Sequence, residues 1–166
     1  MIELTISALA KHKHVTVKNI IGNHDDTSSI MLSVAMSKYF RDEPRVTIDT
    51  LPAKFWYFSF GKCLIGSTHG DTAKPEKLPL IMATDKPHEW ANADFRYWYT
   101  GHIHNKQAME FSGCMWESFR TLAGSDAWHA GAGYRSGKDL SCVLLHKDFG
   151  EIGRNTASLK MVRSVA

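Results

Sequence analysis

The sequence predicts an α/β fold that becomes β-rich toward its C-terminal end. Helix-like and strand-like segments alternate along residues 1–100, and short strand-like runs separated by Gly- and Ser-rich turns follow. The chain has 166 residues, of which 43% are hydrophobic and 22% are charged. This length and composition are typical of a globular protein with a sizeable core, so we expect residues 1–166 to form a single domain.

The N-terminal elements follow from hydrophobic spacing and capping residues. Apolar residues on one helical face predict a helix within residues 1–13, and the apolar run 15–21 predicts a strand. Thr27 or Ser28 can cap a second helix that ends near residue 40. The core-facing residues of this helix would be Ile30, Met31 and Val34.

The remaining elements are bounded by glycine and proline. Strands are predicted over residues 45–49, 54–60, 62–68 and 95–100, and then over 106–111, 115–122, 139–147 and 150–162. Gly61 and Lys62 predict a hairpin between the second and third of these strands. Residues 75–88 predict a helix that Pro79 and Pro87 limit.

Charge and cysteine content exclude several classes of protein. The formal charge is +3 and the Lys and Arg residues are scattered, so charge alone does not indicate a nucleic-acid interface. The three cysteines form no CxxC pair, which favours a reducing compartment with Cys63 and Cys142 as small core residues. Without a long apolar run or a signal-peptide pattern, we expect a cytoplasmic protein that does not bind membranes.

Gly22-Asn23-His24-Asp25 directly follows the first predicted strand. Glycine lets the backbone turn sharply and approach a ligand, and Asn and His offer neutral oxygen and nitrogen ligands to a metal. Because Gly, Asn and Asp also favour turns, a plain β-turn is an equal alternative for this tetrapeptide.

Gly101-His102-Ile103-His104 follows the aromatic strand 95–100. In extended backbone, residues at i and i+2 lie on the same face, so both imidazoles can converge on one site. The alternative is a pair of surface histidines. A third cluster, His69-Gly70, also follows a strand, and ligand sites in α/β sheets gather where strands end.

In this order and spacing, the three clusters resemble the last three motifs of the calcineurin-like metallophosphoesterases. That superfamily includes nucleases of the Mre11 and SbcD type and many phage enzymes. The resemblance covers residues 17–104 and implies a two-sheet sandwich flanked by helices, with a dinuclear metal centre. Mn²⁺ is the metal that we expect in the intact site, and the implied substrate is a phosphodiester, with nucleic acid as one candidate.

The resemblance also implies individual roles. Asn23, His69 and His102 would ligate one metal, and His104 would ligate the other. His24 would contact the phosphate and protonate the leaving oxygen, with Asp25 orienting it. In the long loop 124–138, Arg135 could bind substrate.

The sequence departs from the family pattern in one respect. The Asp-x-His and Gly-Asp-x-x-Asp motifs that precede these clusters in the family do not occur before Gly22, and only Asp71 and Asp126 are nearby carboxylates. We therefore expect the C-terminal portion of an N-terminally truncated phosphoesterase domain, with one metal or none and little or no activity. The alternative is a non-catalytic scaffold, which could form a homo-oligomer through an exposed sheet edge.

Overall fold

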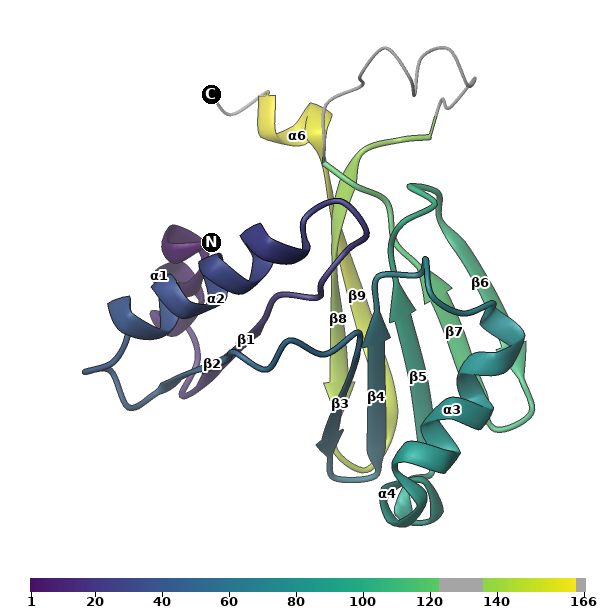
Figure 1. Cartoon of the computed structure of the whole chain (residues 1–166). Helices are drawn as coiled ribbons and strands as arrows, with labels where there is room; N and C mark the ends of the chain where they lie inside the picture. Colours follow the sequence, from purple (N-terminus) through teal and green to yellow (C-terminus); the bar gives the residue numbers. More distant parts are fainter. Residues whose placement is uncertain (123–135, 164–166) are drawn as a thin grey trace. The chain divides into compact units, whose positions relative to one another are not determined.

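The computed structural model describes residues 1–122 and 136–163. Two compact units, Met1–Lys54 and Phe55–Ala166, make up the chain, and each is described by itself (Figure 1). The predicted α/β class is confirmed, whereas the single domain expected over the whole chain stays a prediction. No described helix is long and apolar enough to cross a membrane.

The first unit is a parallel strand pair with two helices packed on it. In chain order its elements are α1 (Ile2–Leu9), β1 (Val15–Lys18), α2 (Asp26–Tyr39) and β2 (Val46–Asp49). β1 and β2 pair in parallel, with Val15 opposite Val46. Val17, Met36 and Phe40 are buried together and form the core of this unit.

Helix α2 differs from the prediction in its cap and in its buried face. Its N-cap is Asp25, ahead of the predicted Thr27 or Ser28. The buried residues of α2 are Ser29, Ser33 and Met36, whereas Met31 and Val34 are 67% and 47% exposed. The expected core positions Met31 and Val34 were therefore wrong, whereas Ile30 is half-buried. The burial is possible because Ser33 Oγ donates to the Ser29 carbonyl oxygen at 3.0 Å, which satisfies a buried hydroxyl.

The second unit is built on a five-stranded mixed sheet with the order β3-β4-β5-β7-β6. Its strands are β3 (Phe55–Phe60), β4 (Cys63–Thr68), β5 (Phe95–Thr100), β6 (Gln107–Phe111) and β7 (Cys114–Ser118). β3 and β4 form the predicted antiparallel hairpin, with Gly61 at φ 56° in its turn. β4, β5 and β7 run parallel, so their carboxyl ends meet at one edge of the sheet.

Helices cover one face of this sheet, as Figure 1 shows. The segment predicted as one helix is η1 (Pro75–Lys77), α3 (Leu78–Asp85) and α4 (Pro87–Asn92), because a proline starts a helix more easily than it continues one. Leu78 and Met82 pack with Trp98 and Trp116 in the largest core cluster. A Cβ at Gly66 would lie 2.6 Å from Met82 Cε, so glycine permits this close helix-sheet approach.

The opposite face carries the antiparallel hairpin of β8 (Asp139–His146) and β9 (Gly150–Ser158). Leu145 of β8 packs against the buried cluster of Cys63, Ile65 and Tyr97. The Glu151 N–H donates to the Tyr97 hydroxyl at 2.9 Å, and burial raises the pKa of that hydroxyl. Two predictions were wrong here. Residues 159–163 form helix α6 (Leu159–Arg163) where a strand was expected, and Cys142 is exposed although Cys63 is buried as expected.

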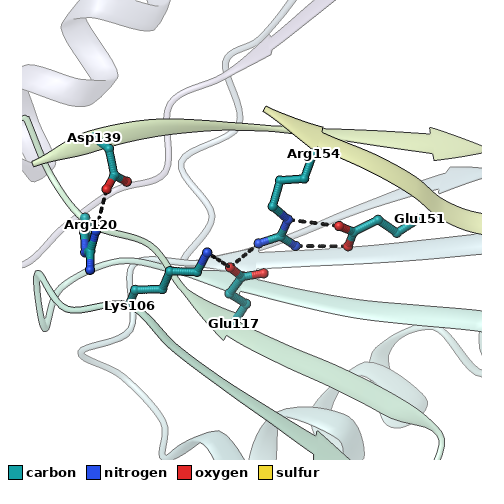
Figure 2. Close-up of polar contacts among 6 residues, drawn as sticks. All are labelled: Lys106, Glu117, Arg120, Asp139, Glu151 and Arg154. Carbon is teal, nitrogen blue, oxygen red and sulfur yellow. Dashed lines mark hydrogen bonds and ion pairs between the residues drawn. The ribbon is translucent and has the colours of Figure 1, made fainter. Parts of the chain in front are cut away.

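A charged network connects the hairpin to the sheet (Figure 2). The Glu117 carboxylate on β7 is only 4% exposed and accepts a hydrogen bond from Arg154 Nη1 on β9. Arg154 also donates to both carboxylate oxygens of Glu151, at 2.9 and 3.0 Å. These two carboxylates raise the pKa of the Arg154 guanidinium. Lys106 Nζ lies 3.9 Å from Glu117 Oε1.

Candidate functional site

The Gly22-Asn23-His24-Asp25 loop joins β1 to α2 in the first unit. Asp25 Oδ1 accepts the Gly22 N–H at 2.8 Å, and Asp25 Oδ2 accepts the Ser29 hydroxyl at 3.0 Å. The loop is thus closed by its own aspartate, which also caps α2, while Asn23 and His24 are exposed. The chain bends at Asn23 and His24, and the β-turn alternative stays a prediction. The metal and catalytic roles expected of Asn23, His24 and Asp25 stay predictions.

The other two clusters meet at one edge of the five-stranded sheet. His69-Gly70 follows β4, and Gly101 to His104 follow β5, the parallel neighbour of β4. The Gly101 N–H donates to the His69 carbonyl oxygen at 2.9 Å, so the two loops are hydrogen-bonded directly. The structure therefore brings both clusters together at the carboxyl ends of adjacent strands, where ligand sites in α/β sheets gather.

The backbone around His102 and His104 is not extended, contrary to the expectation. His102 has φ 64° and His104 has φ 51°, and they are the non-glycine residues with positive φ among those described. The Ile103 N–H donates to the Gly101 carbonyl oxygen at 2.8 Å, which makes His102 the centre of a three-residue γ-turn. This turn is rare and strained for an L-residue, and such strain clusters at functional sites.

The His69 and His102 side chains converge despite that backbone. His69 Nε2 and His102 Nδ1 are 3.2 Å apart, with ring centroids 5.0 Å apart at an interplanar angle of 67°. Two imidazole nitrogens bound to one tetrahedral Zn²⁺ at ~2.0–2.1 Å are about 3.3 Å apart. The observed separation therefore fits either a shared hydrogen bond or a common cation, and His102 is exposed to solvent.

Further ligands around this pair are limited. In the part of the chain that the structure describes, no three His, Cys, Asp or Glu side chains are grouped closely enough to hold a metal ion. His104 lies two residues after His102 but does not form a three-ligand cluster with His69 and His102. The predicted role of His104 at a second metal stays a prediction. Asp126 and Arg135 lie outside the described residues.

Sequence reasoning missed two groups of residues near this edge. The Ser118 hydroxyl donates to the Gly101 carbonyl oxygen at 3.1 Å and so supports the His102 turn from β7. Asn105 and Gln107 line a cavity beside the same loop. Of these residues, only Asn105 could have been identified from the sequence, because it directly follows the Gly-His-Ile-His cluster.

Comparison with known proteins assigns no family to the chain. No protein-family profile matches it, and no curated protein matches its sequence. Among solved structures, Vps29 of Entamoeba histolytica complexed with Zn²⁺ aligns over 94% of this chain and 88% of its own, with 13% identity and a TM-score of 0.47. A single mutant of the same protein aligns over 95% and 89%, with 13% identity and a TM-score of 0.48.

Proposed function

We propose that the chain is a metallophosphoesterase-like domain that binds one divalent cation between His69 and His102. The observation that carries the proposal is the 3.2 Å separation of His69 Nε2 and His102 Nδ1. Exposure of His102 supports it, because an ion can reach the pair from solvent. The strained γ-turn at His102 supports it too, since the hydrogen bonds of Ser118 and Gly101 hold that residue in an unfavourable conformation.

The proposed substrate is a phosphoester, with a phosphodiester or nucleic acid as the candidate class. A bound divalent cation would polarise the phosphoryl group and lower the pKa of a coordinated water. Asn23 would supply a neutral oxygen ligand, and exposed His24 would donate a proton to the leaving oxygen.

The donor set bears on which cation is preferred. Mn²⁺ is the expected occupant of an intact site, but two imidazole nitrogens favour Zn²⁺, because affinity for nitrogen sites rises along the series from Mn²⁺ toward Cu²⁺ and Zn²⁺. A carboxylate ligand would shift that preference toward the harder Mn²⁺. We therefore propose that the His69–His102 pair alone binds Zn²⁺ more tightly than Mn²⁺.

Two measurements on matched variants test the proposal. Calorimetric titration with Zn²⁺ and Mn²⁺ should show one site in the wild type, and His102→Ala should weaken it at least ~10-fold, which corresponds to 1.4 kcal/mol. His88→Ala, in exposed α4 of the same unit, is the control and should bind normally. Equal binding by wild type and His102→Ala would overturn the cation site.

Hydrolysis of bis-p-nitrophenyl phosphate tests the catalytic half. Metal-dependent turnover that His24→Ala abolishes, with cation binding unchanged, supports a phosphoesterase. Cation binding without turnover supports the second candidate, a non-catalytic interaction module.

The second candidate is favoured by the outer surface of the β8–β9 hairpin. Leu140, Cys142 and Leu144 occupy alternate positions of β8 and are all exposed, with 54% and 55% exposure for the two leucines. An apolar strand surface of this kind is typical of a contact surface for another protein. Sizing chromatography of the wild type and Leu144→Lys would test it, because a stable oligomer should dissociate in the variant.

A further inference from the structure

A cavity of about 360 Å³ lies beside the loops that carry His69 and His102. Residues from both loops line it, together with the start of the helical segment and strands β6 and β7. Its size is at the lower end of the range for small-molecule pockets. Among the described residues, none with a charged side chain lines it.

The cavity wall is mostly apolar and rigid. Trp116 and Leu78 are 4% and 1% exposed, and both belong to the largest core cluster of the second unit. Trp116 Nε1 donates to Thr100 Oγ1 at 3.0 Å, so the polar atom of the indole is already satisfied. The Trp116 ring therefore offers an apolar surface to a bound group.

Two primary amides supply the polar part of the lining. Asn105 and Gln107 are exposed residues whose side-chain amides have no hydrogen-bond partner among the described residues. Each amide can donate and accept, so together they suit a ligand edge that carries both kinds of group. A charged ligand is disfavoured, because no charged side chain in the described part of the lining would compensate for its desolvation.

The two loops that carry His69 and His102 also form part of the cavity wall. Gly70 follows His69 and Gly101 precedes His102, and both glycines line the cavity. Gly70 has φ 110°, and a Cβ there would lie 3.2 Å from the Gly101 carbonyl oxygen and 3.3 Å from His102 Cβ. Each glycine is the chain neighbour of one of the two histidines, so the loops that carry the imidazoles also form part of the cavity wall.

We propose that this cavity binds an uncharged, ring-sized organic group with a hydrogen-bonding edge. We further propose that this group is the organic part of the phosphoester whose phosphate binds at His69 and His102, a second step that rests on the proposed function. The apolar wall, the two amides and the lack of charged side chains in the described lining define the organic group. The shared glycines link it to the loops that carry His69 and His102.

The first step is tested without metal by ligand-observed NMR titration with benzamide, benzoate and toluene. Benzamide should bind saturably, and it should bind more tightly than benzoate, which is charged, and toluene, which has no hydrogen-bonding edge. Ala73→Leu fills the cavity and should weaken benzamide binding by at least ~10-fold, equivalent to 1.4 kcal/mol. Ala108→Leu, at an exposed position of β6 outside the lining, is the control and should leave binding unchanged.

Gln107→Leu removes one amide at nearly constant volume and should weaken benzamide more than toluene. A thermal melt of each variant confirms folding, and Asn105→Ala provides a second amide variant that leaves the strand pairing of β6 intact. Absence of saturable benzamide binding, equal binding of benzoate, or unchanged binding in Ala73→Leu would each overturn the cavity assignment.

The second step is tested with Zn²⁺-loaded protein and phenyl phosphate against inorganic phosphate. Phenyl phosphate should bind more tightly, and Ala73→Leu should remove that advantage without changing inorganic phosphate binding. If benzamide binds but phenyl phosphate has no advantage, the link between cavity and phosphoester is wrong and the cavity assignment stands. If Zn²⁺ does not bind, the proposed function fails, while the metal-free titration still decides the cavity.

Discussion

Removing Arg154 should destabilise the second unit far more than neutralising its partner Glu117. The Glu117 carboxylate is 4% exposed, and without Arg154 its nearest cation is Lys106 Nζ at 3.9 Å on a side chain that is 43% exposed. Breaking a buried ion pair from one side costs about 3–5 kcal/mol, because a charge is left buried without compensation. We expect this cost for Arg154→Met.

Glu117→Gln replaces the buried carboxylate by a neutral amide and leaves no buried charge without a partner. The amide oxygen can still accept from Arg154, and Arg154 keeps both hydrogen bonds to Glu151. Its expected cost is about 1–2 kcal/mol, the net value of a hydrogen bond to a charged group. The double variant should cost less than the sum of the two single variants by about 1–3 kcal/mol, because it removes both charges of the pair.

Urea denaturation followed by tryptophan fluorescence measures these differences. All five tryptophans lie at or after residue 56, so the signal reports on the second unit alone. Lys106→Met is the matched control and should cost under about 1 kcal/mol, as exposed ion pairs do. The reasoning is refuted if Arg154→Met costs no more than Glu117→Gln, or if the two effects are additive.

Three further predictions concern packing, capping and ionisation. Gly66→Ala should destabilise the second unit by about 1–3 kcal/mol in urea, since the added Cβ would lie 2.6 Å from a core methionine, and an unchanged midpoint would contradict this packing. Asp25→Ala should cost the first unit about 1–3 kcal/mol and increase hydrogen exchange of α2 amides, because it removes the carboxylate that accepts from the Gly22 N–H and the Ser29 hydroxyl, whereas unchanged exchange would contradict this role of Asp25. Burial raises the pKa of the Cys114 thiol from 9.0 to about 12, so the folded state keeps this proton to a higher pH than the unfolded state does. The free energy of unfolding should therefore fall as pH rises above 9. Cys114→Ala should flatten this fall, and an equally steep pH profile in the variant would contradict the assignment to Cys114.

Strand positions in the second unit were largely predictable from the sequence. Residues 95–100 form β5 as expected, because an aromatic and β-branched run bounded by Gly101 leaves few alternatives. The β3–β4 hairpin was equally predictable, since glycine tolerates the positive φ of its turn. These features depend on local sequence and backbone sterics.

What the sequence could not predict depends on tertiary contacts. Ser29 and Ser33 can be buried while Met31 is exposed, because the two serine hydroxyls donate to Asp25 Oδ2 and to the Ser29 carbonyl oxygen. The left-handed turn at His102 likewise depends on a contact from a separate strand, since Ser118 of β7 donates to the Gly101 carbonyl oxygen. Periodicity carries no information about such contacts.

The candidate site was predictable in part. The sequence placed His69 and His102 at the ends of strands, and the structure brings their rings together through a different backbone conformation from the one expected. The cavity beside them was not predictable, because its lining residues Leu78, Gln107 and Trp116 come from three separate segments.

The most direct test of the proposed cation site is imidazole ¹⁵N NMR during a Zn²⁺ titration. We expect His69 Nε2 and His102 Nδ1 to change together and to saturate at one equivalent, because these are the two nitrogens that lie 3.2 Å apart. The ring of His88, which is exposed on α4, should not change. Changes at other histidines with these two nitrogens unaffected would contradict a cation site at this edge of the sheet.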